Sequence, residues 1–187
     1  MGEPITDGIS RHDSEELDTN NQGTPPPGYK FSTHKLAKTL QDTSKVPLVL
    51  VACGSYSPVT YLHLRMFEMA ADYFINHPKY ELIGGYFSPV SDYYQKEGLA
   101  PAHHRVKMCE LATETSSTWL MVDSWEALQP SYQRTAVVLD HFNDELNGNL
   151  GGMTLPDGSR RKIQILLLAG GDLIESMGRK DVWASED

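Results

Sequence analysis

The chain has 187 residues, a formal net charge of −9, 40% hydrophobic residues and 22% charged residues. This length suits one domain with a tail and is sufficient for a sizeable core. The negative charge argues against a broad nucleic-acid surface, so we expect no nucleic-acid partner. The sequence contains no apolar run of transmembrane length, and its N-terminus lacks the hydrophobic region of a signal peptide, so we expect no membrane association.

The two cysteines, Cys53 and Cys109, both lie in apolar segments and show no metal-ligand spacing. They are typical of reduced core residues in an intracellular protein. We therefore expect a location in the nucleus or cytoplasm, and we assign no metal ligands among the side chains.

The first 45 residues are polar, with scattered acidic residues and the run Pro25-Pro26-Pro27-Gly28. They contain too little apolar material for a core, so we expect residues 1–45 to form a disordered tail. Within it, residues 31–40 could form a short helix that docks on the domain. Residues 46–187 are expected to form that domain.

A buried strand, a polar turn and a helix follow one another at the start of the domain. Residues 46–53 form an almost unbroken apolar run, which is typical of a strand covered on both faces. A turn rich in Gly, Ser and Pro occupies residues 54–63, and apolar residues then recur at helical spacing at Leu64, Phe67, Ala71 and Phe74. Backbone N–H groups at such a helix start favour a bound phosphate.

Strands and helices alternate through the rest of the domain. We expect strands at 80–87, 119–123 and 162–169, helices at 103–114, 131–146 and 173–177, and an exposed loop at 147–161 with a turn at 156–159. Repeated strand–helix units predict an α/β fold, a Rossmann-like parallel sheet with right-handed crossovers and ligands at the carboxyl ends of its strands.

The turn after the first strand is neither of the common phosphate loops, because it lacks Gly-x-Gly-x-x-Gly and the Gly-Lys-Ser/Thr ending of a P-loop. It offers Thr60 and His63, three residues apart at the start of the helix. A histidine there can donate hydrogen bonds to phosphate oxygens and stabilise charge that develops during transfer. The alternative is a helix-capping Thr60 beside a surface His63.

Further polar clusters follow the second and last strands. Lys96 either contacts a phosphate as a point charge or is an ordinary solvated lysine. Asp172 follows two glycines and either accepts ribose hydroxyls or caps a helix, and these roles are compatible. Trp125, Tyr132 and Trp183 offer aromatic faces that either stack on a planar base or simply pack.

Together these segments resemble a family. GSYSPVTYLHLRMFE, SPVSDYYQKEGL, HHRVKMCELA, VDSWEALQ and LLLAGGDLIESMGRKDVWASED occur in the order seen in nicotinamide mononucleotide adenylyltransferases of the eukaryotic type. The first motif alone indicates only the wider nucleotidyltransferase superfamily, through a T-x-x-H version of its H-x-G-H signature. The second and the last motifs are more specific, and the resemblance covers residues 46–187.

The resemblance implies that AMP is transferred from ATP to nicotinamide mononucleotide, giving NAD and pyrophosphate with the help of Mg2+. Thr60 and His63 are the implied catalytic residues. The implied ATP-binding residues are Gly54, Ser55, Tyr56, His63, Gly170 and Asp172. The implied mononucleotide-binding residues are Tyr94, Lys96, Tyr132, Thr135 and Trp183. Many relatives have tryptophan where this chain has Tyr132, a change that preserves stacking with a smaller ring.

The family also carries a C-terminal I-S-S-T-x-x-R segment that grips the ATP phosphates, and this sequence does not contain it. We therefore expect a truncated domain whose sheet is incomplete at the C-terminal end. The open edge of its last strand would favour pairing with another chain, including a homo-oligomer. One alternative is a non-catalytic form that binds nucleotide or pairs with a full-length subunit. Another is a different nucleotidyltransferase, such as a cytidylyltransferase, that shares only the T-x-x-H loop.

Overall fold

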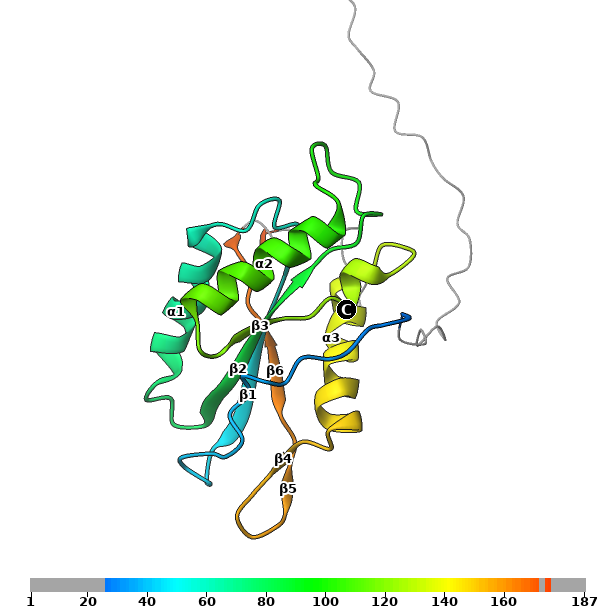
Figure 1. The fold of residues 1–187 in the computed structure, drawn as a ribbon. Helices are drawn as coiled ribbons and strands as arrows, with labels where there is room; N and C mark the ends of the chain where they lie inside the picture. Colours follow the sequence, from blue (N-terminus) through cyan, green and yellow to red (C-terminus); the bar gives the residue numbers. More distant parts are fainter. Residues whose placement is uncertain (1–25, 172–173, 176–187) are drawn as a thin grey trace, which may run out of the picture.

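The computed structural model describes residues 26–171, 174 and 175 of the chain (Figure 1). Its elements in chain order are β1 Val46–Gly54, α1 Tyr61–Phe74, β2 Tyr80–Pro89, α2 Ala102–Ser116, β3 Leu120–Val122, the 3-10 helix η1 Glu126–Leu128, α3 Thr135–Asn143, the π-helical turn η2 Asp144–Asn149, β4 Met153–Thr154, β5 Arg160–Arg161 and β6 Gln164–Leu167.

Four parallel strands form the main sheet, in the order β3-β2-β1-β6. β1 lies inside the sheet between β2 and β6, which explains why its residues form an unbroken apolar run. All four strands end at the same edge of the sheet, and the loops that follow them gather there. The predicted α/β fold with a parallel sheet is confirmed.

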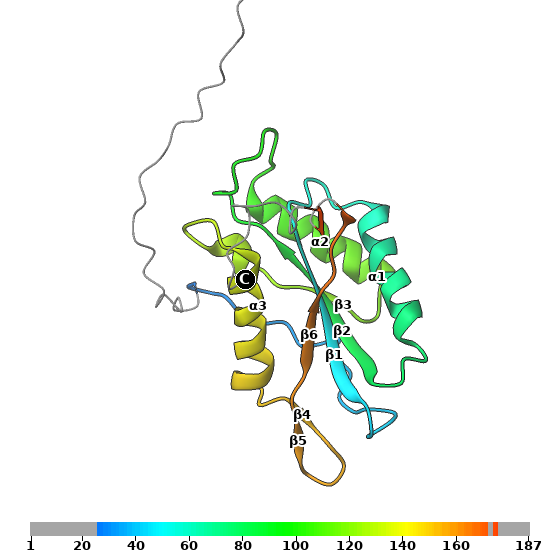
Figure 2. The ribbon, with the colours of Figure 1, turned by 180° about the vertical axis from the view of Figure 1, so that it is seen from behind.

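Alternate residues of β1 face two separate cores. Leu48 and Leu50 pack with Phe67 of α1 and Cys109 of α2 on one face. The other face holds residues of β1 and β2 together with Val138, Phe142 and Leu146 of α3 and η2. Figures 1 and 2 accordingly show α1 and α2 on one side of the sheet and α3 on the other.

Residues 26–45, which we call the strap, differ from the disordered tail that we expected. They pack beside α3, where Phe31 stacks on Tyr86 at a ring-centroid distance of 5.1 Å. Leu40 is buried in the same core, and Leu36 packs against it. The strap contains turns and bends, and the helix predicted at residues 31–40 does not form. α3 alone leaves part of the apolar face of the sheet uncovered, and the strap covers that part. Residues 1–25 lie outside the described part of the chain.

The segment between β3 and β6 also differs from the prediction. α3 begins at Thr135, not at residue 131, because residues 131–134 after Pro130 form a bend and irregular backbone that ends in the extended residue Arg134. The expected loop at 147–161 contains the end of η2 and the antiparallel hairpin β4–β5, whose turn lies at the predicted residues 156–159. Of the short helix expected at 173–177, Ile174 and Glu175 are helical and the other residues lie outside the described part.

No helix within the described residues is both long and apolar enough to cross a membrane. Cys53 and Cys109 are free thiols.

Candidate functional site

The turn between β1 and α1 is held in a strained shape by one tyrosine. Tyr56 has a positive φ of 43°, an uncommon conformation for a residue with a side chain. Its ring is buried and its hydroxyl donates a hydrogen bond to the carbonyl of Ala52 at 2.8 Å. A Cβ on Gly54 would lie 2.9 Å from that ring, so glycine is required there. The turn is therefore fixed before any ligand arrives.

His63 is oriented by the residue that begins its helix. The backbone N–H of Thr60 donates to Nδ1 of His63 at 2.9 Å. Since Nδ1 accepts this bond, the ring proton lies on Nε2, which is then the hydrogen-bond donor. Partial burial lowers the pKa of His63 below its usual 6.5, which favours the neutral ring. The capping alternative is confirmed, because Thr60 and His63 form a capping box at the start of α1. This cap leaves the Nε2–H group of His63 without a role in the box, so a phosphate role for His63 is compatible with it and stays a prediction.

The loop after β2 reaches back to the turn after β1. Lys96 donates from Nζ to the hydroxyl of Ser55 at 3.2 Å. The hydroxyl of Ser57 accepts a hydrogen bond from the backbone N–H of Ala100 at 2.9 Å. Two of the polar clusters recognised in the sequence are thus in direct contact, with an exposed ammonium group between them.

Arg105 of α2 also joins the turn after β1 to the loop after β2, and the sequence analysis did not identify it. Its side chain is fully buried. The guanidinium donates to the carbonyls of Ser55 at 3.0 Å and Ala100 at 2.6 Å, and to Oδ1 of Asp92 at 3.1 Å. A signal was present in the sequence, because Arg105 occupies the buried stripe of α2 with Ala102, Cys109 and Thr113. A charged residue on an apolar stripe marks a buried ionic contact.

Two of the predicted aromatic residues form a pair. The rings of Tyr94 and Tyr132 stack with a centroid distance of 5.7 Å and an interplanar angle of 29°. Their exposed fractions are 38% and 50%, so both keep free surface. Thr135 follows closely as the first residue of α3. Trp125, by contrast, is buried and stacks on His141 at 4.3 Å, so it packs in the core.

A buried carboxyl group whose charge influences Tyr132 was also missed. Glu126 is only 2% exposed and accepts a hydrogen bond from Ser88, the penultimate residue of β2, at 2.5 Å. Burial raises the pKa of Glu126 to about 8, with the nearby charge of Asp123 adding to the effect. The group is therefore protonated at neutral pH and adds no net charge beneath the site. An acid inside the apolar run WEAL was its sequence signal.

The end of β6 brings Gly170 to the same edge of the sheet. Leu167 pairs with Val51, and the backbone N–H of Leu168 donates to the carbonyl of Val51 at 2.7 Å. Gly170 is exposed and comes three residues after Leu167, just as Gly54 comes three residues after Val51 on the neighbouring strand. Asp172 and Trp183, the remaining predicted site residues, lie outside the described part of the chain.

This edge combines donors suited to phosphate with surfaces suited to a planar ring. The donors are Nε2 of His63 and Nζ of Lys96, and the ring surface belongs to Tyr94 and Tyr132. Within residues 26–171, His, Cys, Asp and Glu form no group of three that could hold a metal ion. These are the kinds of group that bind a phosphate and an aromatic base.

Comparison with known proteins gives a consistent result. Residues 51–185 match the family described as cytidylyltransferase-like. The chain is 64% identical over 159 residues to nicotinamide/nicotinic acid mononucleotide adenylyltransferase 2 of Saccharomyces cerevisiae, covering 85% of this chain and 40% of that protein. The nicotinamide/nicotinic acid mononucleotide adenylyltransferase of Schizosaccharomyces pombe is 62% identical, with 85% of this chain and 43% of that protein covered. Bovine nicotinamide/nicotinic acid mononucleotide adenylyltransferase 1 is 38% identical, with 79% and 62% covered.

The chain spans about 40% of the length of the yeast relatives that it matches. The resemblance read from its motifs is confirmed by these identities, which all fall on proteins named as mononucleotide adenylyltransferases. The chain belongs to the cytidylyltransferase-like family and, within it, is similar to the nicotinamide mononucleotide adenylyltransferases.

Proposed function

We propose that the protein is a nicotinamide-nucleotide adenylyltransferase, which transfers AMP from ATP to nicotinamide mononucleotide and forms NAD and pyrophosphate. The observation that carries this proposal is the contact between Lys96 and Ser55, which joins the turn after β1 to the loop after β2. A reaction between two nucleotides needs two phosphate positions side by side, and in this proposal the contact would lie between them. The names and identities of the relatives support the same substrates.

The turn after β1 would bind ATP. Gly54, Ser55 and Tyr56 would approach the nucleotide, while Thr60 holds the ring of His63 so that Nε2 donates to a phosphate oxygen. Gly170 and Asp172 would line the adenosine side after β6. The rigid shape of the turn supports this role, since preorganised donors stabilise developing charge without rearrangement.

The other half of the site would bind the mononucleotide. Lys96 would lie near its phosphate, and Tyr94 would lie beside it. Tyr132 and Trp183 would flank the nicotinamide ring, with Thr135 nearby. The exposed face of Tyr132 supports this assignment.

In the proposed reaction an oxygen of the mononucleotide 5′-phosphate attacks the α-phosphorus of ATP. The bond between the α-phosphorus and the bridging oxygen breaks, and the electron pair leaves with pyrophosphate. No covalent enzyme intermediate is required, so the protein contributes positioning and charge stabilisation. Mg2+ would enter with ATP, bound to its phosphates, and would neutralise charge on the leaving pyrophosphate.

We also propose an intracellular location, in the nucleus or cytoplasm. The free thiols of Cys53 and Cys109 support it, since a reducing compartment keeps cysteines unpaired. β6 is an edge strand of the sheet within the described residues, so a second copy of the chain could pair there.

The test is NAD formation by the purified chain supplied with ATP, Mg2+ and nicotinamide mononucleotide, with the product measured by chromatography. We expect NAD and pyrophosphate in equal amounts and none when the mononucleotide is omitted. Binding of both nucleotides without turnover would support the non-catalytic alternative. Turnover of CTP with a phosphorylated alcohol, and none with ATP, would support a cytidylyltransferase.

A further inference from the structure

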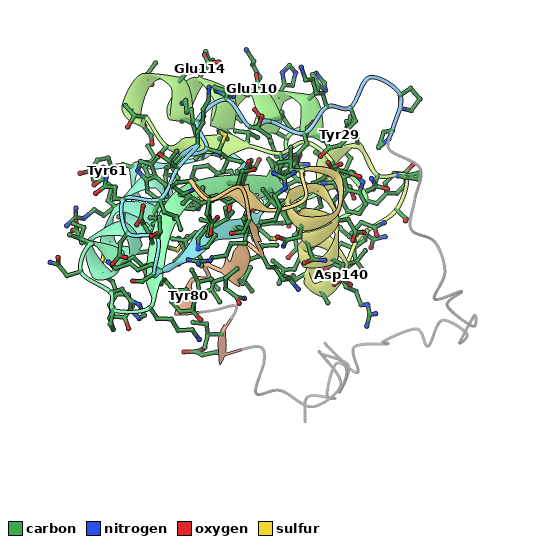
Figure 3. All side chains as sticks on the ribbon, turned by 90° about the horizontal axis from the view of Figure 1, so that it is seen from below. Tyr29, Tyr61, Tyr80, Glu110, Glu114 and Asp140 are labelled. Carbon is green, nitrogen blue, oxygen red and sulfur yellow. The ribbon has the colours of Figure 1, made fainter. Side chains whose placement is uncertain are left out.

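Three polar side chains from distant parts of the chain meet at the carboxyl end of β3. The hydroxyl of Tyr29 donates to Oδ1 of Asp123 at 2.9 Å. Nε2 of His141 lies 3.0 Å from Oδ2 of the same carboxylate and 3.0 Å from the Tyr29 oxygen. Tyr29 comes from the strap, Asp123 follows β3 and His141 belongs to α3. Figure 3 shows Tyr29 at the end of the strap that lies near α3.

The hydrogen atoms in this cluster can be assigned from chemistry. Burial and the Asp123 carboxylate raise the pKa of Tyr29, so its hydroxyl stays protonated and gives its single proton to Asp123. Nε2 of His141 must then carry a proton, which it shares between Asp123 and the Tyr29 oxygen. Asp123 is only 1% exposed, so each of these bonds is sheltered from water.

The cluster closes a loop that carries the proposed mononucleotide residues. Asp123 and His141 are the ends of residues 123–141, which we call the Tyr132 segment, and their contact joins its two ends. Between them lie Tyr132 and Thr135. The segment is also tied to β2 and the loop after it: the backbone N–H of Asp123 donates to the carbonyl of Phe87 at 2.9 Å, Glu126 accepts from Ser88, and the carbonyl of Ser131 accepts from Ser91 at 3.3 Å.

We propose that Tyr29 is a positioning residue for the mononucleotide side of the site, because it locks the closed Tyr132 segment from the strap. This inference rests on the proposed function. A hydroxyl that engages both ends of the segment limits how far Tyr132 can move relative to Tyr94. A base that stacks on Tyr132 then meets a ring already in place, which lowers the ordering cost of binding.

The experiment compares Tyr29→Phe with Tyr86→Phe. Tyr86 donates its hydroxyl to the carbonyl of Ser32 at 2.6 Å, so its variant also removes one hydrogen bond that holds the strap but leaves the Tyr132 segment untouched. Binding of nicotinamide mononucleotide and of ATP is measured separately by calorimetry. We expect Tyr29→Phe to weaken mononucleotide binding about fivefold to tenfold, the effect of losing one ordinary intramolecular hydrogen bond. ATP binding should stay within twofold, and Tyr86→Phe should change neither.

Hydrogen exchange of residues 124–134, measured without ligand, completes the test. Faster exchange of these residues in Tyr29→Phe than in Tyr86→Phe supports the anchoring of the Tyr132 segment by the Tyr29 hydroxyl. Unchanged mononucleotide binding in Tyr29→Phe, or equal weakening in both variants, overturns the positioning role. If the unaltered chain binds neither nucleotide, the proposed function fails, and equal exchange in the two variants would then overturn the anchoring as well.

Discussion

The two halves of the site are built in different ways. The proposed ATP side is mostly local, because residues 54–63 form one turn and the start of one helix. In it, Tyr56 is fixed by Ala52 of the preceding strand and His63 by Thr60. The proposed mononucleotide side is assembled from distant segments. It needs the loop after β2, the Tyr132 segment and the strap.

This difference predicts how each half responds to change. A local turn depends on its own residues, so substitutions elsewhere should alter its chemistry little. An assembled half depends on buried contacts between segments, so its ligand affinity should follow the integrity of those contacts. The substitutions below test this division, from the largest expected effect to the smallest.

Arg105→Met should have the largest effect, because Arg105 supports both halves. Removing the guanidinium leaves the carbonyls of Ser55 and Ala100 without their buried donor. We expect the free energy of unfolding to fall by about 3 kcal/mol, measured by urea denaturation. The control is Lys107→Met on the same helix, where the ammonium is exposed and a much smaller change in stability is expected. Equal stability of the two variants would contradict the role of Arg105 as a tie between the loops.

His63→Ala tests the ATP side alone. If Nε2 donates to a phosphate oxygen in the transition state, its loss should lower kcat for NAD formation about a hundredfold, or about 2.7 kcal/mol. Mononucleotide binding should stay within twofold, since that half is built elsewhere. His77→Ala, at the opposite end of α1, should leave kcat unchanged. Retained turnover in His63→Ala would remove the catalytic role of His63.

The contrast between local and assembled structure also explains which features the sequence predicts and which it does not. The strand–turn–helix from residue 46 to residue 74 is set by apolar pattern and turn residues, and its bounds were predicted closely. For the strap, the sequence indicated that residues 31–40 could dock on the domain but wrongly as a helix, and the disorder expected around them was also wrong. Tyr29, Phe31, Leu36 and Leu40 become ordered because the open face of the sheet gives them partners. The pairing of Tyr94 with Tyr132 likewise depends on where two loops end in space.

Glu126→Gln probes the buried support of the mononucleotide side through pH. The pKa of Glu126 is about 8 in the folded chain, above its usual 4.5. Between these values the unfolded chain releases the proton and the folded chain keeps it, so the free energy of unfolding falls as pH rises. The lowered pKa of His63 acts in the opposite direction, since its contribution is lost as pH falls.

Glutamine keeps an acceptor for Ser88 but does not ionise. The unaltered chain should therefore lose about 1–3 kcal/mol more than Glu126→Gln between about pH 5 and pH 9, measured by urea denaturation across this range. Parallel pH profiles for the two proteins would show that Glu126 titrates normally.

Lys96→Met should have the smallest effect and defines the boundary between the halves. Lys96 belongs to the loop after β2, yet its Nζ lies 3.2 Å from the hydroxyl of Ser55 in the turn after β1. If it serves the mononucleotide phosphate, its loss should weaken mononucleotide binding about tenfold, or about 1.4 kcal/mol, and leave ATP binding within twofold. Lys162→Met, at the far end of the sheet, should alter neither. Calorimetry with each nucleotide separates the outcomes. Equal weakening of both ligands would mean that Lys96 contacts the phosphates of both nucleotides. The proposed ATP side would then depend on a residue outside the turn after β1.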